Sequence, residues 1–236
     1  MKNLLQRWFA PRPRLSPQQS ARLASWHALP EPGHTATSGR ARLVVVDVET
    51  TGLNLMTDTL ISIGAVAVVN GGIALSDSFS VVLQQRESSR KENILIHGIS
   101  GSAQREGMLP ADALLAFLEY LGKSPLVAFH VAFDETMIKR AMRQYLGIAF
   151  KHPWLDLAYV LPALWPESKH SHRSLDDWSA RFAIRNDDRH NAVADALATA
   201  ELLLVAITQA RQAHGTDSYD GLHRLERAFR NSREIF

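Results

Sequence analysis

Two acidic side chains stand near the end of an apolar run in the segment 43–54, LVVVDVETTGLN. An unpaired charge inside a buried strand is costly, so Asp47 and Glu49 require either solvent or a cation at this point. Residues two apart along a strand share one face. The segment therefore predicts a paired anionic site at the carboxyl end of a strand, where α/β sheets usually bind ligands. The alternative for this motif alone is a strand end with two solvated acids and a turn.

Two further acids and one histidine stand where other elements begin. Asp134, in LVAFHVAFDE, follows a short apolar run at the expected start of a helix, which capping alone could explain. We expect Asp195, in HNAVADA, about one and a half turns into a long helix, on a face of alanines that allows close approach. His190 lies at the entry of this helix, after a polar loop, where a lone histidine is usually just exposed.

Together, these four carboxylates and the histidine predict a specific chemistry. Oxygen-only ligands suit Mg²⁺ or Mn²⁺ rather than zinc. Two such ions about 3.5–4 Å apart can activate a water and stabilise both oxygens of a phosphoryl displacement. A histidine near its ordinary pKa can accept the proton of that water. The cation that Asp47 and Glu49 require would then be a metal pair.

The elements that must position these residues can be read from periodicity and turn signals. Three strands come first, and strands and helices are mixed after them, which predicts an α/β domain with helices over a mixed sheet. Asn-Gly at 70–71 predicts a hairpin between the second and third strands. The strands are expected at 42–49, 60–69, 74–83 and 125–130, and the helices at 16–27, 111–122, 134–147, 152–164, 174–182 and 190–212.

Composition and charge indicate the cellular location, the partners and the division of the chain. The chain of 236 residues has no cysteine, which excludes disulfides and thiolate chemistry and fits a reducing cytoplasm. We expect no apolar stretch that approaches the ~20 residues needed to cross a bilayer, and therefore no membrane contact. Residues 1–40 carry a net charge of +5, which favours either a polyanionic partner or a solvated leader. We expect a basic extension and linker at 1–40, one catalytic domain at 41–210 and a helical tail at 211–236.

The motifs resemble those of the DEDD superfamily of 3′–5′ exonucleases, in its histidine-bearing, DnaQ-like (DEDDh) branch. VVVDVETTGLN resembles the first exonuclease motif, VAFHVAFD the second and RHNAVADA the third. ILIHGIS, WLDLAYVLPALWP and HRSLDDWSARFAI are similar to the segments between them, so that the likeness covers about 42–205. The resemblance implies a ribonuclease-H-like fold and hydrolysis of single-stranded nucleic acid from its 3′ end. It also implies release of nucleoside 5′-monophosphates and association with a DNA polymerase, as in the proofreading epsilon subunits of bacterial polymerase III.

Carried over by position, the resemblance assigns a role to each matching residue. Asp47, Glu49, Asp134 and Asp195 would hold two Mg²⁺ or Mn²⁺ ions, and His190 would be the general base. The other implied positions would contact the terminal nucleotides, and they are Thr50, Thr51, Gly52, Leu53, His97, Ile99, His130 and Phe133. One departure is His130, which stands where family members commonly have asparagine, so the usual contact near the scissile nucleotide is in doubt.

Three other functions use some of the same residues. A 3′–5′ exoribonuclease or oligoribonuclease would share the whole site, because contacts to a 2′-OH cannot be read from these motifs. An aspartyl-phosphate phosphatase also has an acid pair at a strand end, but Glu49 fits it poorly and the third motif would have no role. A non-catalytic module that binds nucleic-acid ends has no need of four carboxylates that repel its ligand.

Overall fold

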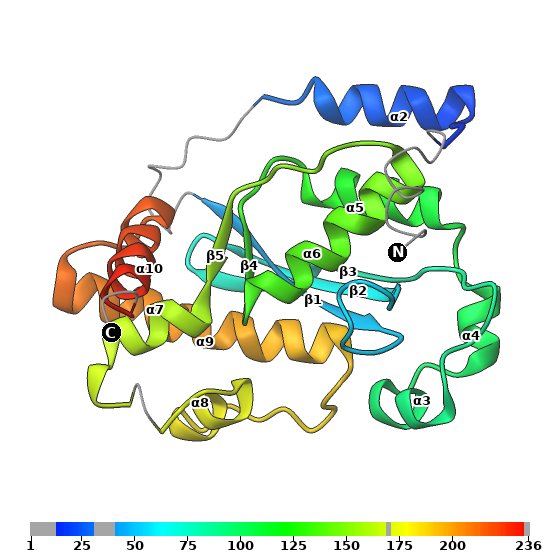
Figure 1. Ribbon diagram of the computed structural model, residues 1–236. Helices are drawn as coiled ribbons and strands as arrows, with labels where there is room; N and C mark the ends of the chain where they lie inside the picture. Colours follow the sequence, from blue (N-terminus) through cyan, green and yellow to red (C-terminus); the bar gives the residue numbers. More distant parts are fainter. Residues whose placement is uncertain (1–12, 31–40, 169–170, 234–236) are drawn as a thin grey trace.

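The computed structural model describes residues 13–30, 41–168 and 171–233, and its centre is one five-stranded sheet (Figure 1). The spatial order is β3-β2-β1-β4-β5. β2 pairs antiparallel with both β1 and β3, whereas β4 and β5 continue the sheet in parallel with β1. The mixed sheet confirms the predicted fold class. Its strands are β1 (Arg42–Thr50), β2 (Leu60–Val69), β3 (Gly72–Val82), β4 (Leu126–Ala128) and β5 (Trp154–Asp156).

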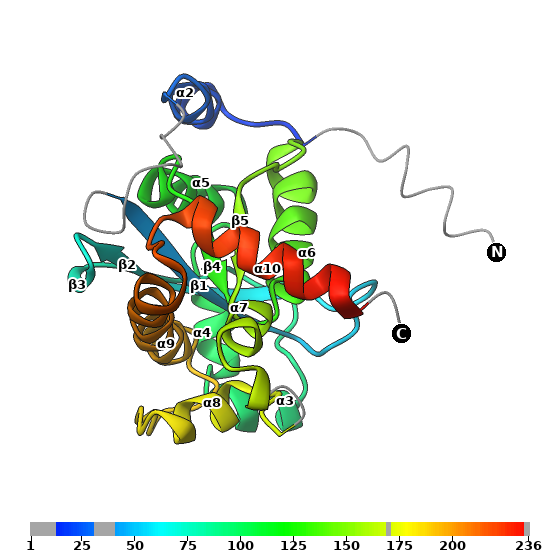
Figure 2. The same ribbon diagram turned by 90° about the vertical axis from the view of Figure 1, so that its left-hand side faces the viewer.

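Helices cover both faces of this sheet, as Figure 2 shows. One face carries α2 (Pro17–His27), α5 (Pro110–Leu121) and α6 (Val131–Ala141), and α6 continues as a π-helical turn, Met142–Leu146. The other face carries α7 (Leu157–Leu164), α8 (Leu175–Arg181), α9 (Ala192–His214) and α10 (Tyr219–Arg233). The short helices are α3 (Lys91–His97), α4 (Gly101–Glu106) and a 3₁₀ turn at Pro166–Ser168.

The valine run of β1 is continuous because both of its faces are buried. Val44, Val46 and Val48 pack in the core on the α5 and α6 side, while Leu43 and Val45 pack in the core on the α9 side. A strand covered on both faces needs apolar residues at successive positions rather than alternation with polar ones. Because side chains alternate, the odd-numbered acids that follow Val45 lie on the α9 side.

The hairpin between β2 and β3 follows the prediction. Val69 pairs with Gly72, so the loop consists of Asn70 and Gly71 alone. Both have positive φ, at 55° and 76°, as a type I′ turn requires.

The predicted helix at 16–27 is also present, and it belongs to the packed domain. A capping box of Ser16 and Gln19 begins α2, and Trp26 is buried with its Nε1 donating to the Gly122 carbonyl at 2.7 Å. Arg22 pairs with Glu119 at 2.7 Å. This arginine is therefore paired within the protein. The other positive charges of the expected basic extension, apart from exposed Arg14, lie outside the described residues, as does most of the linker; they are Lys2, Arg7, Arg12 and Arg40.

Three boundaries differ from the sequence prediction. The segment 152–164 is not helical throughout, because 154–156 pairs with β4 as β5 before α7 begins. Helix α6 begins at Val131, so Asp134 lies in its first turn. Helix α9 begins at Ala192, so Asp195 also lies in the first turn rather than deeper in the helix. β5 was missed because it lies within a run that resembles a helix, whereas the equally short β4 was predicted within 125–130.

Helix α9 also corrects the expectation about apolar length. Among the described residues, it is the one helix long and apolar enough to span a membrane, and 56% of that window is buried inside the domain. Leu202, Leu203 and Ala206 lie in the core beside β1 and β2 residues. The core helix of a globular domain meets the same criterion, so the apolar character of α9 is accounted for by its packing on the sheet.

Candidate active site

Asp47 and Glu49 lie at the carboxyl end of β1, on the face that α9 covers. Asp47 pairs across the ladder with Gly64 of β2. The first turn of α9 lies directly on this glycine, since a Cβ atom added to Gly64 would be 2.3 Å from the Val193 nitrogen. The missing side chain thus lets α9 approach the sheet beside Asp47.

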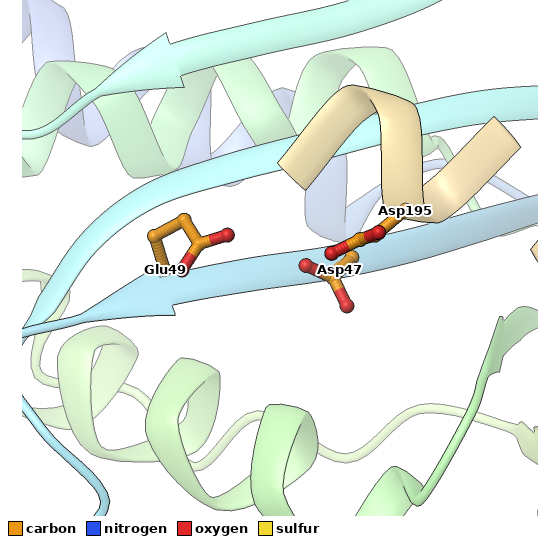
Figure 3. Close-up of side chains that lie close together, drawn as sticks. All are labelled: Asp47, Glu49 and Asp195. Carbon is orange, nitrogen blue, oxygen red and sulfur yellow. The ribbon is translucent and has the colours of Figure 1, made fainter. Parts of the chain in front are cut away.

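Asp195 completes a cluster of three acids at this point (Figure 3). Ligand oxygens of Asp47, Glu49 and Asp195 all lie within 4.8 Å of one another. Asn191 caps α9 by accepting from the backbone N–H groups of Val193 and Ala194, at 3.1 and 3.4 Å. The cap and the close packing at Gly64 bring residues 148 positions apart in sequence into one anionic site.

Asp134 approaches the same site from α6. It is 4% exposed and lies just beyond the carboxyl end of β4, the neighbour of β1. Its oxygens are not among those within 4.8 Å, but its charge contributes to the raised pKa of Asp47. The structure therefore brings three of the four predicted acids into contact distance and the fourth into electrostatic range.

Burial of these carboxylates raises their pKa values. Desolvation is the largest cause for Asp47, whose pKa lies well above its ordinary value, and the charges of Asp134, Asp195 and Glu49 raise it further. Desolvation, followed by the charge of Asp195, raises the pKa of Glu49 to about 8. The pKa of Asp134 is raised mainly by desolvation, although hydrogen bonds from backbone N–H groups oppose this. A cation at the cluster would relieve all of these costs.

The donor set fits a hard divalent cation. It consists of carboxylate oxygens, which Mg²⁺ and Mn²⁺ prefer, and their spacing allows one ion to contact several of them. The acids lie at the carboxyl end of the central strand β1, and the β1–β2 loop that follows carries exposed Leu53. The arrangement can hold an ion beside an apolar surface suited to a base.

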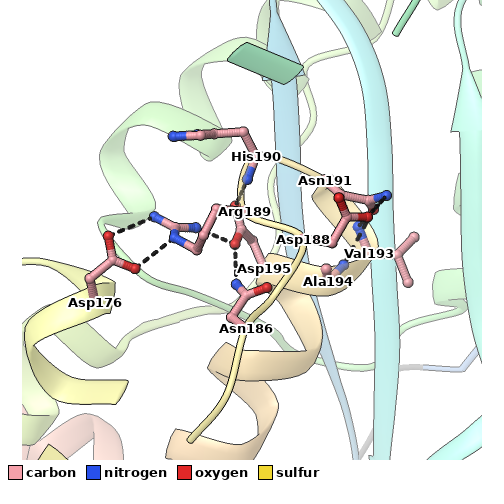
Figure 4. A network of polar contacts seen from close by, with 9 residues as sticks. All are labelled: Asp176, Asn186, Asp188, Arg189, His190, Asn191, Val193, Ala194 and Asp195. Atoms are coloured by element: carbon pink, nitrogen blue, oxygen red, sulfur yellow. Dashed lines mark hydrogen bonds and ion pairs between the residues drawn. The ribbon is translucent and has the colours of Figure 1, made fainter. Parts of the chain in front are cut away.

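An arginine that the sequence analysis did not select already contacts the cluster (Figure 4). Arg189 donates through Nη1 to Asp195 Oδ1, and its Nε lies 2.6 Å from Asp176 Oδ1 of α8. Asn186 donates to the same Asp195 oxygen. Arg189 directly precedes His190 in the sequence, but no spacing rule distinguishes it from the neighbouring Arg185.

His190 contacts the cluster through its backbone. Its N–H donates to Asp195 Oδ2 at 3.0 Å, and its φ of 63° is left-handed. The side chain is exposed, and Figure 4 shows the ring directed away from the Asp195 carboxylate. The role of general base therefore stays a prediction, and it requires the imidazole to turn.

A buried acid on β5 is a second residue that the sequence analysis missed. Asp156 is 2% exposed and accepts from the backbone N–H groups of His130 and Val131 at 3.0 and 3.2 Å. It also pairs with Arg230 of α10 at 3.1 Å. Asp156 therefore holds the first turn of α6, which carries Asp134, and α10 completes this anchor. Its position inside an apparent helical run concealed it in the sequence.

The residues of the first motif that are predicted to contact a nucleotide differ in exposure and in their hydrogen bonds. Leu53 is 86% exposed and remains free for a base. The Thr51 N–H donates to the Thr59 carbonyl at 3.0 Å, so it is already committed within the protein. Thr50 is buried, and its hydroxyl donates to the Gly52 carbonyl at 2.7 Å. The predicted nucleotide contact at Thr51 therefore stays a prediction, and its backbone N–H is paired with Thr59 in this conformation.

The other predicted contacts are also divided between surface and interior. His97 is buried, with Nδ1 accepting from the Ile99 N–H and Nε2 lying 3.2 Å from Ser89 Oγ, so its ring does not line an open pocket. Ile99 is half-buried, and Phe133 is half-buried against the core. His130 is exposed, and its Nε2 lies 3.1 Å from the Arg173 carbonyl.

Comparison with known sequences gives a family match over most of this domain. Residues 44–203 match the sequence model of the RNase T family, described as "Exonuclease". The DNA polymerase III PolC-type of Clostridium perfringens is 33% identical over 165 residues, 68% of this chain and 11% of that protein. The Bacillus subtilis protein of the same name is 32% identical over 181 residues, 76% of this chain and 12% of that protein. The chain thus spans about an eighth of these relatives.

Comparison with solved structures shows the fold. The crystal structure of E. coli Exonuclease I in complex with a dT13 oligonucleotide has a TM-score of 0.61 at 17% identity, covering 73% of this chain and 42% of that one. Exonuclease X in complex with 5′ overhanging duplex DNA has a TM-score of 0.57 at 19% identity, covering 76% of this chain and 99% of that one. These likenesses confirm the predicted ribonuclease-H-like fold.

Proposed function

This chain belongs to the DnaQ-like (DEDDh) exonuclease family, whose sequence model covers residues 44–203, and from that premise we propose that it is a divalent-metal-dependent 3′–5′ exonuclease on single-stranded DNA. The reaction hydrolyses the terminal phosphodiester bond and releases nucleoside 5′-monophosphates. The observation that carries this proposal is the cluster of Asp47, Glu49 and Asp195, whose ligand oxygens lie within 4.8 Å of one another.

Asp47, Glu49, Asp134 and Asp195 would hold two Mg²⁺ or Mn²⁺ ions. When bound, the ions would lower the pKa of a water and stabilise the charge that develops on the phosphate. The raised pKa values of Asp47 and Glu49 support this assignment, because charged acids packed so closely need a compensating cation.

His190 would accept the proton of the attacking water. Its imidazole is exposed to solvent and attached to a loop whose backbone already contacts Asp195. Rotation of this side chain toward the acid cluster would place the imidazole, which can accept a proton, beside the reacting phosphate. Leu53 is exposed and would pack on the terminal base. Ile99, Phe133 and His130 would make the other contacts to the terminal nucleotides.

DNA is the favoured polymer because the relatives of this chain are segments of proteins named DNA polymerase III. Association with a DNA polymerase is part of the same proposal, as is the division into an extension at 1–40, a catalytic domain at 41–210 and a tail at 211–236. An exoribonuclease that uses the same site is the second candidate, since none of the predicted contacts distinguishes a 2′-hydroxyl.

Matched DNA and RNA oligonucleotides labelled at the 5′ end test these functions. Incubation with Mg²⁺ or Mn²⁺ should produce a ladder that shortens from the 3′ end, and EDTA should stop it. Faster shortening of RNA would show that the protein is an exoribonuclease rather than a DNA exonuclease. No shortening of either polymer in the presence of metal would favour a module that only binds nucleic-acid ends.

A further inference from the structure

We infer that Arg189 is an internal counter-ion of the acid cluster, which a divalent metal must displace from Asp195, and that this displacement moves the loop that carries His190. The inference rests on the proposed metal site. It adds a positioning residue to that site, acting through Asp195 and His190.

Both oxygens of Asp195 already accept hydrogen bonds in this conformation. Oδ1 accepts from both Arg189 and Asn186, and Oδ2 accepts from the backbone N–H of His190. All three donors come from the single loop 186–190, which Figure 4 shows beside the start of α9. A metal that binds Asp195 through Oδ1 must therefore compete with the charge-assisted hydrogen bond from Arg189.

The charge of Arg189 reaches the other acids as well. Its guanidinium contacts Asp195, whose ligand oxygen lies within 4.8 Å of those of Asp47 and Glu49. A guanidinium at this position thus supplies part of the positive charge that a metal would bring. The metal-free protein can keep its acids close together because this cation is built into the chain.

Arg189 has a second partner, with which it can stay paired after it releases Asp195. Its Nε lies 2.6 Å from Asp176 Oδ1, and Nη2 donates to Asp176 Oδ2 at 3.4 Å. Asp176 belongs to α8, and it is contacted through Nε and Nη2 rather than the Nη1 that donates to Asp195, so this pair can persist when Asp195 is released. Release of Asp195 therefore leaves the guanidinium paired at the rim of the site.

Displacement of Arg189 from Asp195 by a metal must affect the conformation of His190, because His190 follows Arg189 directly in the chain. Its left-handed backbone is held by the hydrogen bond to Asp195 Oδ2, and its ring points away from the acids. Loss of the Arg189 and Asn186 bonds at Oδ1 frees the loop on one side. Metal binding would in this way be linked to the turn of the imidazole toward the site.

Calorimetric titration of the whole protein with Mn²⁺ alone tests the competition. Arg189→Gln should bind Mn²⁺ about tenfold more tightly than wild type, because the competing cation is gone. Arg185→Gln is the matched control, since Arg185 is 83% exposed and, within the part of the chain that the structure describes, forms its ion pair with exposed Asp187. Its affinity should stay within about twofold of wild type, because solvent and salt screen so exposed a charge. Unfolding in EDTA should occur at a lower temperature for Arg189→Gln than for Arg185→Gln.

The imidazole signal of His190, followed by ¹H–¹³C NMR and assigned through His190→Gln, tests the coupling. In wild type it should shift when diamagnetic Mg²⁺ is added, and in metal-free Arg189→Gln it should already lie close to the metal-bound position. If Arg189→Gln is poorly folded, Arg189→Lys serves instead, with a shorter, less well paired cation and an affinity above that of wild type.

The outcomes separate this inference from the proposed function. A wild-type protein that binds no Mn²⁺ would refute the metal site and the inference with it. A wild type that binds Mn²⁺, together with an Arg189→Gln protein of equal or lower affinity, would overturn the inference and leave the exonuclease proposal in place. An unmoved His190 signal in both proteins would overturn the coupling to the loop.

Discussion

Gly64 of β2 lies against the first turn of α9 so closely that a Cβ atom there would be 2.3 Å from the Val193 nitrogen. Gly64 is also the ladder partner of Asp47, and Val193 stands two residues before Asp195. One position without a side chain therefore sets the separation of two acids on different elements. It couples the packing of α9 to the geometry of the candidate site.

Gly64→Ala should damage both folding and metal binding. The added methyl meets backbone atoms, which cannot rotate away, so α9 must shift from the sheet. We expect a loss of about 1–3 kcal/mol in the free energy of unfolding by urea, and weaker Mn²⁺ binding. Gly72→Ala is the control, because its nearest neighbour to an added Cβ is the Val69 oxygen at 4.0 Å. Equal stability of the two variants would contradict the close packing at Gly64.

His190→Gln should lower kcat about 10²–10⁴-fold if the imidazole is the general base. Glutamine keeps the backbone N–H that donates to Asp195, so binding of oligonucleotide in Ca²⁺ should be retained. Single-turnover cleavage of a 5′-labelled DNA measures the effect. His214→Gln, at the other end of α9, serves as the control. Near-native turnover of His190→Gln would remove this residue from the chemistry.

The raised pKa of Glu49 predicts a pH dependence of stability in the metal-free protein. In the unfolded chain Glu49 titrates near its ordinary pKa, about 4.3, whereas in the folded protein desolvation raises its pKa to about 8. Between these values the folded state holds a proton that the unfolded state has released. The free energy of unfolding should therefore fall as pH rises through this window.

Glu49→Gln isolates this contribution. The variant should gain stability relative to wild type as pH increases from 5 to 8 in EDTA, and the difference should level off above that. Urea denaturation at several pH values measures it. Parallel profiles for the two proteins would show that the pKa of Glu49 is not raised.

Asp156→Asn should loosen the start of α6. An amide offers one acceptor oxygen where the carboxylate accepts from His130, Val131, Ala158 and Arg230. Leaving buried donors unpaired costs about 1–3 kcal/mol, and the shift of α6 should also weaken Mn²⁺ binding through Asp134. The control is Asp187→Asn on an exposed loop, expected to change stability by less than about 0.5 kcal/mol.

Local sequence patterns were sufficient to predict a large part of the fold and to identify the acids of the candidate site. The spacing of Asp47 and Glu49 in an apolar run placed both on one face, and Asn70-Gly71 specified the hairpin, because both are decided by neighbours in the chain. Three-residue β5 and the exact starts of α6 and α9 could not be read in this way. β5 depends on pairing with β4, and the start of α6 is held by distant Asp156, whereas the cap of α9 is its own Asn191.

The sequence by itself determined the family, the mixed α/β sheet and the set of candidate ligands, since motifs and periodicity are properties of consecutive residues. Only the tertiary structure decided that Arg189 donates a hydrogen bond to Asp195 and that His97 is buried. Only the fold joined Asp156 to the first turn of α6, 25 residues earlier in the chain. These relationships depend on which side chains meet after distant elements pack, and hydrogen-bond partners and burial are defined only by that packing.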